Sequence, residues 1–535
     1  MMMLLLKRTL VPTVCFCVLI IGCTSVFAEN VLISCSVGEG SHYFVGKTIG
    51  KYLVKHGHNV TVLLSNAYAY RAENPDDQEL NFVIFNHSVP PEAVRERHKG
   101  YSKIALEPLG VGFFYNLTMS QRQGNVDDCE DLLLRNPDVM HRLEHGNFSA
   151  VIYDQIWSCS LFLAMKLDTM AIMSNPMAAL DLAGAQVGNP TNLALMPTGM
   201  TGFRPEMSFF QRVVNVLAHQ AIKIILTFFV SPFDELRQRL AIRPDLPGTV
   251  MELIATYPSL FLFNFEFGIE YPAALYPNII PIGGITAKPA GPLPQELEDF
   301  MESSGEHGVI LFTLGTYAHQ IRVGWLQPFA EALEKFPQKV LWQMSTTPPF
   351  KLPSNVKTLP WLPQNDILGH PKTRLFISQG GNNGFYESQY HGVPIIIIPL
   401  GGDAVDAATR AVHRGFGLTV DKSEVTTERL HTAIHTILNN DSYAQVAKRN
   451  SEILRSRDMH PGDRAAFWVT HVIRHGGEYM RNPSLELNFV QKHLIDVAAF
   501  LLAVIASVVV VAFFLCRCCC RCCKRVCFRP KQKRD

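Results

Sequence analysis

This sequence of 535 residues has no excess of positive or negative charge. Its 48 basic and 47 acidic residues cancel to a formal net charge of +1, so no overall basic field indicates a nucleic-acid partner. Charged residues make up only 18% of the chain, and hydrophobic residues make up 47%. This composition excludes intrinsic disorder for most of the chain.

Cysteine is scarce in the body of the chain, although the whole sequence holds 13. Three cysteines lie in the first 23 residues and seven lie between Cys516 and Cys527, which leaves only Cys35, Cys129 and Cys159. Three cysteines cannot form a disulfide framework, and they allow one bridge at most.

The N-terminus has the pattern of a secretory signal. Two basic residues precede an apolar run over 11–21, and a V-x-A pattern ends at Ala28. An uncleaved anchor helix is the alternative, but Pro12 and the shortness of the run favour cleavage. We therefore predict that residues 1–28 are a signal peptide.

A second apolar segment, near the C-terminus, is long enough to cross a membrane. Residues 497–515 are 19 residues without a charge, which corresponds to about 28 Å of helix. Eight Lys and Arg residues follow in the tail 516–535, and the positive-inside rule assigns such a tail to the cytosol. We predict a single-pass type I membrane protein with a transmembrane helix at 494–515 and a luminal body.

The tail carries two further signals. Lys531 and Lys533 resemble the KxKxx retrieval signal of endoplasmic-reticulum membrane proteins. The Cys-rich tail is a candidate for palmitoylation, whereas metal binding is disfavoured because the tail lacks histidine and is strongly positive. Glycosylation sequons in the body fit a luminal location. We predict glycans at four of the five sequons and not at Asn59, which lies beside an apolar strand; the four are Asn86, Asn116, Asn147 and Asn440.

Alternating strand and helix patterns divide the body into two halves. The first half opens with a strand over 30–36, a loop over 37–42 and a helix over 44–56, followed by further short apolar strands. A Pro- and Gly-rich stretch follows, and the alternation then begins again at 308. Two such halves predict an α/β fold with two doubly wound sheets that face each other across a cleft. The predicted domains are an N-terminal lobe at 29–285, a linker at 286–307 and a C-terminal lobe at 308–490.

The apolar stretch 211–230 has two interpretations. It is either a core helix or the wall of a substrate pocket that touches a bilayer.

The segment from Trp361 to Pro394 is the densest in groups that carry chemistry. A strand over 375–377 leads into Gly380, Gly381 and Gly384, which open the next helix. Glycines at a helix N-terminus let backbone N–H groups approach an anion, and the helix dipole favours negative charge. The pattern indicates a diphosphate site, although an ordinary turn has the same composition.

The segment 361–394 resembles the signature of the UDP-glycosyltransferase superfamily, which comprises the UDP-glucuronosyltransferases and their relatives. The resemblance extends to G-S-H at 40–42, F-T-L-G-T at 312–316, H-P-x-D-R-A-x-F-W at 460–468 and the C-terminal anchor. It implies two facing Rossmann-like lobes, the GT-B glycosyltransferase architecture, plus one C-terminal transmembrane helix. It also implies an inverting transfer from a UDP-sugar to a hydroxyl of a small lipophilic acceptor. The UDP-sugar is a co-substrate, so no cofactor is expected, and the lack of any D-x-D pair gives no sign of a metal.

The same resemblance implies roles for single residues. His42 matches the general base, and Asp154 matches the acid that orients it. A neutral imidazole can take a hydroxyl proton near pH 7 while a carboxylate on its other nitrogen sets the tautomer. Trp361 would stack on uracil, Glu387 would accept hydrogen bonds from the ribose, and Asp403 would hold the donor sugar. The other UDP-sugar-binding residues implied are Thr313, Thr316, Gln364, Gln379, Gly380, Gly381, Asn383 and Gly384.

Three positions depart from the family pattern. Gln379 stands where the family usually has histidine, Ala404 replaces glutamine after Asp403, and Gln343 replaces a basic residue. Each lost hydrogen bond costs about 1–3 kcal/mol, so we predict slow turnover and relaxed choice of the donor sugar. The rival interpretation is a weak or inactive relative that binds UDP or lipophiles, or forms an oligomer with an active homologue. A soluble lipophile carrier is opposed by the anchor and the uridine signature.

Overall fold

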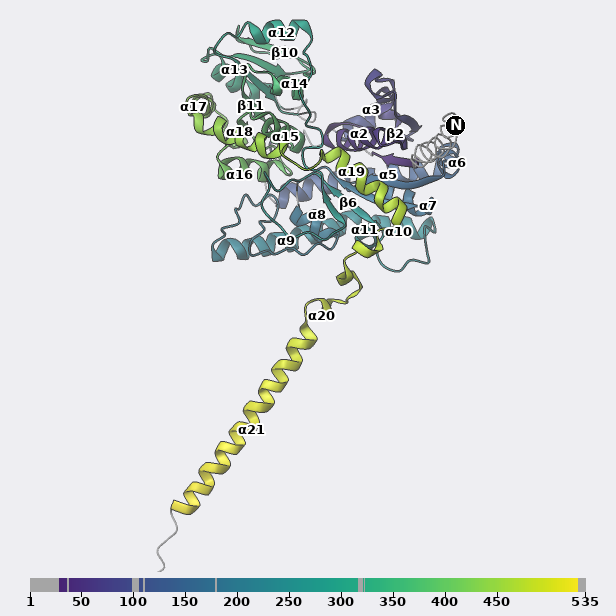
Figure 1. Ribbon diagram of the computed structural model, residues 1–535, viewed down its shortest axis with the longest axis vertical. Helices are drawn as coiled ribbons and strands as arrows, with labels where there is room; N and C mark the ends of the chain where they lie inside the picture. The colour runs from purple at the N-terminus through teal and green to yellow at the C-terminus, as the bar shows by residue number, and fades with distance from the viewer. Residues whose placement is uncertain are drawn as a thin grey trace, which may run out of the picture. The chain divides into compact units, whose positions relative to one another are not determined.

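The computed structural model describes residues 28–35, 38–98, 105–108, 111–178, 180–315, 321 and 323–527. The predicted signal peptide up to residue 27, Thr316 and the two lysines of the retrieval signal lie outside these residues. The chain divides into a body that ends at Arg481 and a separate C-terminal unit that begins at Asn482. Both are visible in Figure 1.

The first lobe is built on a parallel sheet of seven strands in the order β3-β2-β1-β4-β5-β6-β7. The sequence predicts the first five of these strands but not β6 and β7, whose short apolar runs are buried on both faces and show no alternation. The strands are β1 (Asn30–Ser34), β2 (Asn59–Ser65), β3 (Asn81–Phe85), β4 (Phe148–Asp154), β5 (Met170–Asn175), β6 (Leu260–Phe263) and β7 (Ile279–Pro281).

The second lobe has a parallel sheet of six strands in the order β10-β9-β8-β11-β12-β13. The two parallel α/β sheets confirm the predicted fold class. The strands are β8 (Val309–Thr313), β9 (Lys339–Gln343), β10 (Val356–Leu359), β11 (Thr373–Ser378), β12 (Ile395–Ile397) and β13 (Gly417–Thr419).

Helices lie on both sheets, as parallel connections require. In the first half of the chain they are α2 (Gly40–Lys55), α3 (Pro91–His98), α5 (Val111–Leu134), α6 (Pro137–Glu144), α7 (Cys159–Lys166), α8 (Leu180–Gln186), α9 (Phe209–Val230), α10 (Pro232–Arg239) and α11 (Val250–Thr256). In the second half they are α12 (Gln295–Glu302), which lies within the predicted linker, α13 (Gln327–Leu333), α14 (Gln364–Gly369), α15 (Asn382–His391), α16 (Ala404–Arg414), α17 (Thr427–Leu438) and α18 (Asp441–Arg455).

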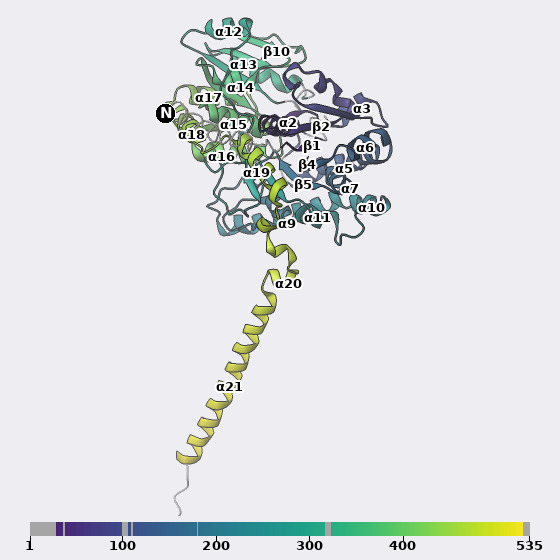
Figure 2. The same cartoon turned by 45° about the vertical axis from the view of Figure 1, so that its right-hand side comes forward.

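One helix of the second half packs on the first lobe. The helix α19 (Pro461–His475) lies beside α2 in Figures 1 and 2. Its side chains Ala465, Val469 and Val472 are fully buried in the same core as Ile33 and Tyr43. The chain therefore returns to the first lobe after α18, although chain order alone predicts that the second lobe continues to residue 490. The apolar stripe of α19 at spacings of three and four residues is the physical reason, because it is buried against α2 and the strands β6 and β7 of the first lobe.

The helix α9 has one buried face and one exposed face, so neither interpretation of 211–230 alone describes it. Ile222, Phe229 and Val230 are buried, as a core helix requires. The opposite face leaves large apolar side chains in solvent, with Phe210 77% and Leu217 65% exposed.

Among the cysteines that the structure describes, one pair forms a disulfide: Cys129 and Cys159, whose Cα atoms are 5.3 Å apart, join α5 to α7. This is the one bridge that three body cysteines allow. Cys35 is a buried free thiol, and its pKa is raised by burial.

All five sequon asparagines are exposed. The side-chain amide of Asn59 is hydrogen-bonded to both Asn30 and Asn81. Glycosylation of the other four stays a prediction.

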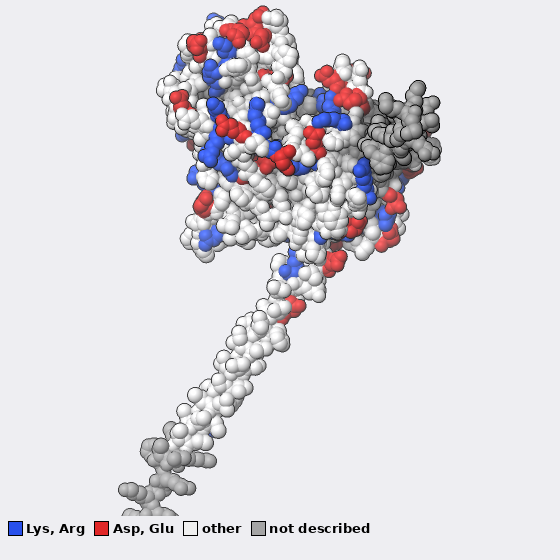
Figure 3. Space-filling model, viewed as in Figure 1, with Lys and Arg blue, Asp and Glu red and all other residues white. Residues whose placement is uncertain are grey.

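The C-terminal unit contains α20 (Phe489–Lys492) and the long helix α21 (Ile495–Cys527). Its stretch Ile495–Cys523 is long and apolar enough to cross a membrane, with a mean hydropathy of 3.0 and no buried residue. Figure 3 shows this helix free of charged side chains over most of its length. A C-terminal apolar helix is thus present as predicted, and it continues beyond residue 515.

Candidate active site

The predicted site residues gather at the points where the strand order of each sheet reverses. In the first sheet the chain runs from β1 outward through β2 and β3, and later from β4 outward on the other side. In the second sheet the reversal lies between β8 and β11. Ligands of doubly wound α/β sheets bind at these positions, outside the carboxyl ends of the strands.

His42 and Asp154 meet at the reversal point of the first sheet. Asp154 is the last residue of β4, and His42 lies on the helix that follows β1. The imidazole Nδ1 of His42 is 2.6 Å from Oδ2 of Asp154. The other oxygen, Oδ1, accepts a hydrogen bond of 2.9 Å from the backbone N–H of Ile156. The predicted pair is therefore in contact, with the carboxylate held from both sides.

The position of His42 differs from the predicted loop. The helix α2 begins at Gly40, four residues before the predicted helix, so His42 occupies its first turn. Gly40 has φ +67°, a left-handed conformation that glycine adopts without strain. This residue lets the helix begin early and directs His42 toward Asp154.

Electrostatics prepare His42 to accept a proton. Burial opposes the charged imidazolium, but the charge and hydrogen bond of Asp154 outweigh it and raise the pKa of His42 above its ordinary value. Asp403, in the other lobe, adds to the same shift. Asp403 and the pair His42–Asp154 are thus close enough to interact, although they belong to different lobes.

At the reversal point of the second sheet, two glycine turns face each other. Thr313 ends β8, and its hydroxyl accepts a hydrogen bond of 3.1 Å from the N–H of Gly315. Gly315 and Gly380 have φ +76° and +88°, so a side chain at either position would be strained. The turn after β11 then leads into the N-terminus of α15.

Gln379 covers these turns. A Cβ added to Gly315 would lie 2.2 Å from Nε2 of Gln379, and one added to Gly381 would lie 2.7 Å from the same atom. The amide of Gln379 thus lies against both glycine turns of the predicted diphosphate site. An amide N–H can donate to phosphate oxygen in place of an imidazole.

The predicted ribose acid Glu387 is buried on α15 and has two protein partners. Gln364 donates to its Oε2 at 2.7 Å, and the hydroxyl of Thr286 donates to its Oε1 at 3.1 Å. Burial raises the pKa of Glu387 to about 7, although both hydrogen bonds act to lower it. Gln364 therefore orients Glu387, and Thr286 is a contact that the sequence analysis missed.

The indole of Trp361 stands at the rim, 56% exposed, as a stacking platform for a base requires. Its ring lies 6.1 Å from that of Phe44 on α2, so residues of both lobes border the predicted base site.

Asp403 precedes α16 and lies next to Ala404, which is 3% exposed. Burial raises the pKa of Asp403, while the positive charge of Arg410 acts to lower it. A Cβ added to Gly380 would meet the methyl group of Ala404 at 3.2 Å. Ala404 therefore presents only a methyl group beside the glycine turn.

The sequence analysis also did not identify Arg410 and Glu270 as residues of this region. Nε of Arg410 is 2.9 Å from Oε2 of Glu270, an ion pair that joins the two lobes. The spacing along α16 was an available signal, because positions 403 and 410 are two turns apart on one helix face. Nothing local to the sequence marked Glu270 or Thr286.

Asn383 lies at the contact between the two lobes. Its side-chain oxygen accepts a hydrogen bond of 3.2 Å from Asn264, and the neighbouring Asn382 donates to the carbonyls of Pro176 and Asn264. These bonds set the approach of the two lobes next to the predicted sugar site.

A cavity with solvent space of about 60 Å³ lies between the lobes near Asp403. Its walls combine apolar side chains with the ionisable groups Asp181, Glu270, Asp406 and Arg410. Burial and the neighbouring Asp181 raise the pKa of Asp406 to about 8. The apolar residues of the lining are Ala178, Met196, Pro197, Phe203 and Phe265.

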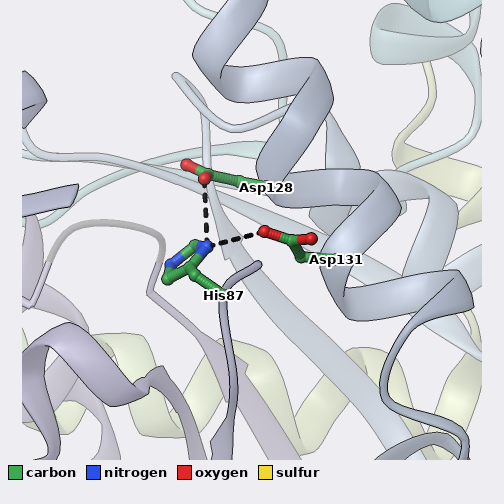
Figure 4. A group of neighbouring side chains, drawn as sticks. All are labelled: His87, Asp128 and Asp131. Carbon is green, nitrogen blue, oxygen red and sulfur yellow. Dashed lines mark hydrogen bonds and ion pairs between the residues drawn. The ribbon is translucent and has the colours of Figure 1, made fainter. Parts of the chain in front are cut away.

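A second ionisable cluster, away from this site, is shown in Figure 4. Nδ1 of His87 lies 3.2 Å from a carboxylate oxygen of both Asp128 and Asp131. Arg97 pairs with Asp128, and Arg135 pairs with Asp131 at 2.6 Å. Because guanidinium groups already neutralise both acids, we interpret this group as an ion-pair network and not as a metal centre.

Comparisons with known proteins agree with this geometry. The family model described as UDP-glucoronosyl and UDP-glucosyl transferase matches residues 30–533. UDP-glucuronosyltransferase 1-2 of Mus musculus is 33% identical over 508 residues, covering 94% of this chain and 93% of its own. UDP-glucuronosyltransferase 2A2 of Homo sapiens is 31% identical over 504 residues, covering 92% of each.

Among solved structures, the glycotransferase of kitacinnamycin aligns with a TM-score of 0.59 at 18% identity, over 83% of this chain and 99% of its own. The calicheamicin glycosyltransferase CalG4 aligns with a TM-score of 0.54 at 17% identity, over 84% and 99%. These likenesses establish the fold.

Two α/β lobes, each with a parallel sheet, are the architecture of GT-B glycosyltransferases. The chain belongs to the UDP-glucuronosyl and UDP-glucosyl transferase family. It is a glycosyltransferase that takes a UDP-sugar as donor.

Proposed function

We propose that the protein transfers a hexose or hexuronic acid to the hydroxyl of a small lipophilic acceptor, with inversion and with His42 as the general base. The observation that carries the proposal is the 2.6 Å contact between His42 and Asp154, in a site that Asp403 of the other lobe also faces.

The base works through its tautomer. Asp154 accepts a hydrogen bond from the N–H at Nδ1, so the proton stays on that nitrogen and the lone pair on Nε2 is free for the acceptor hydroxyl. As Nε2 of His42 takes the proton of the acceptor hydroxyl, the acceptor oxygen attacks the anomeric carbon from the side opposite UDP. The imidazolium that forms is stabilised by the Asp154 carboxylate.

Departure of UDP depends on hydrogen-bond donors. The amide of Gln379, the backbone N–H groups of the Gly380–Gly381 turn and the N-terminus of α15 supply them. Such preorganised donors stabilise charge that develops on the diphosphate. Trp361 and Glu387 hold the uridine in place.

Turnover of a radiolabelled UDP-sugar by microsomes tests the proposal, with UDP-glucuronic acid, UDP-glucose, UDP-galactose and UDP-N-acetylglucosamine as donors. We expect an inverted, β-linked product. His42→Ala is expected to lose turnover by at least about a thousandfold while binding of UDP stays within twofold, because the base and the nucleotide lie on different lobes. Retention of more than a few per cent of the wild-type rate would place the base elsewhere.

The second candidate is a weak relative that binds UDP without efficient transfer. Ala404 favours this second candidate, because its buried methyl group can neither donate nor accept a hydrogen bond with a sugar hydroxyl. Wild-type binding of UDP without turnover of any of the four donors would support this candidate over the first.

We further propose that the protein is a type I protein of the endoplasmic-reticulum membrane with a luminal body. The helix α21 supports an anchor, and the exposed apolar face of α9 fits a second contact with lipid. Protease added to sealed microsomes should remove only the tail, and endoglycosidase H should shift the protected fragment. Digestion of the body would refute this topology.

A further inference from the structure

The helix α21 does not end where its apolar run ends. It continues as helix through Cys527, well past Leu515. The stretch Ile495–Cys523 spans 29 residues, or about 43 Å at 1.5 Å per residue, whereas a hydrocarbon core is about 30 Å thick. The helical turns after Leu515 therefore lie at the level of the lipid headgroups.

Cysteines and arginines occupy different faces of these turns. Six cysteines in this stretch are exposed free thiols. At about 100° per residue, four of them share one stripe, and the other two share a neighbouring stripe. Arg517 and Arg521 share a third face, which lies about 130° from the centre of the larger stripe, as far as the stripe of Cys518 and Cys522 does on the other side. The four are Cys516, Cys519, Cys520 and Cys523, and the two are Cys518 and Cys522.

This geometry excludes a shared metal ion for the stripe. Four thiolates around one zinc ion lie within about 4 Å of one another, because each Zn–S bond is about 2.3 Å long. Cys516 and Cys523 are separated by about 10 Å along the helix axis. Structural disulfides are rare on the cytosolic side of a membrane, where thiols are kept reduced. Exposed free thiols at headgroup depth are instead accessible to a membrane-soluble acyl donor.

We propose that the stripe Cys516, Cys519, Cys520 and Cys523 is a site of S-acylation by long-chain acyl-coenzyme A. In each transfer the cysteine sulfur attacks the carbonyl carbon of the acyl thioester and forms a new thioester. The bond to coenzyme A breaks, and coenzyme A leaves as a free thiol with the proton of the cysteine, so no oxidant or reductant is consumed. The acyl chains insert beside α21 and hold its end at the membrane surface. The inference rests on the cytosolic location of this end proposed above.

Metabolic labelling of the full-length protein with an alkynyl fatty acid tests the proposal. Wild-type protein is expected to carry label that neutral hydroxylamine removes, as a thioester requires. Replacing the four stripe cysteines by serine should remove at least four-fifths of the label. The matched control, Cys518→Ser with Cys522→Ser, should retain at least half. Absence of hydroxylamine-sensitive label on the wild type, or equal loss in both variants, would overturn the assignment.

Two further measurements separate this result from the proposed function. UDP-sugar turnover by the same microsomes reports the transferase alone, and the His42→Ala protein should be labelled as strongly as the wild type. Failure of turnover with normal labelling would refute only the transfer mechanism. Protection of the tail from added protease together with absence of label would refute both the topology and the S-acylation.

Discussion

The substitution Asp154→Asn is the sharpest test of the His42–Asp154 pair, because it keeps the shape of the side chain but removes its charge and replaces one acceptor oxygen by an NH₂ donor. In the wild type, Oδ2 of Asp154 accepts from Nδ1 of His42 at 2.6 Å, and Oδ1 accepts from the N–H of Ile156 at 2.9 Å. An asparagine oxygen can keep the bond to Ile156. Its NH₂ group then faces Nδ1 of His42 and donates where the carboxylate accepted.

The imidazole must then change tautomer. With Nδ1 as an acceptor, the proton of His42 moves to Nε2, the nitrogen that should receive the proton of the acceptor hydroxyl. In catalytic triads the corresponding change lowers kcat about 10⁴-fold, or about 5.5 kcal/mol in the barrier. We expect a loss of that order here, with binding of UDP unchanged.

A second consequence is a shift in the pH profile. The charge and hydrogen bond of Asp154 are what raise the pKa of His42 against burial. Without that charge the pKa of His42 falls, so the acid limb of kcat/KM should move to lower pH while the plateau drops.

The assay is initial-rate turnover of the best donor from pH 5 to 9. Asp138→Asn is the matched control, because Asp138 is exposed on α6 and distant in sequence from both partners. A variant with more than a tenth of the wild-type rate would refute tautomer control by Asp154. An unmoved acid limb would show that His42 is not the titrating base.

Further outcomes follow from the donor site and the buried acids. Trp361→Ala should weaken UDP about five- to a hundredfold in calorimetry, since stacking on one base contributes about 1–3 kcal/mol; an unchanged affinity would move the base site elsewhere. The pKa of Glu387 is about 7 and its ionised form accepts from the ribose, so UDP-sugar affinity should fall as the pH is lowered through 7. Glu387→Gln should remove that dependence, and an unaltered profile in this variant would contradict the assignment. The raised pKa of Asp406, about 8, means that the folded protein holds a proton that the unfolded chain releases near pH 4. The contribution of protonated Asp406 to the stability of the folded protein is therefore lost as the pH rises through 8, and Tm should fall. In Asp406→Asn this fall in Tm between pH 6 and 9 should be smaller. Gln379→His with Ala404→Gln should raise kcat/KM about tenfold on the best donor, since one restored hydrogen bond contributes about 1–3 kcal/mol; no gain would mean that the site suits a different sugar.

Local features were readable from the sequence because they depend on neighbours along the chain. The apolar run 497–515 predicts a helix whatever surrounds it, and the structure has α21 there. Gly380 follows a buried strand and has φ +88°, so its residue type reflects its own backbone conformation. The alternation of strands and helices likewise predicted both sheets, since each βαβ unit is a local pattern.

Pattern reading failed where burial removed the pattern. The strand β6 is buried along its whole length, so no alternation distinguishes its two faces. The early start of α2 was missed because a glycine and a serine commonly indicate a loop. In the folded chain the same glycine permits the helix to begin before His42.

The candidate site depended on which strands became neighbours. His42 and Asp154 are 112 positions apart in the chain, and they meet only because β4 pairs with β1, with Tyr153 opposite Ser34. No property of either residue encodes that distance, so the family resemblance was needed to couple them from sequence. The pairing is decided by burial of the whole sheet.

Contacts between the lobes were decided by tertiary structure alone. The bond from Thr286 to Glu387 and the ion pair of Glu270 with Arg410 join segments more than a hundred residues apart. The sequence by itself determined the class of fold, the apolar helix near the C-terminus and the chemical groups available to the site. Only the packing of one lobe on the other decided which of those groups touch, because that packing depends on apolar surface contributed by distant segments at once.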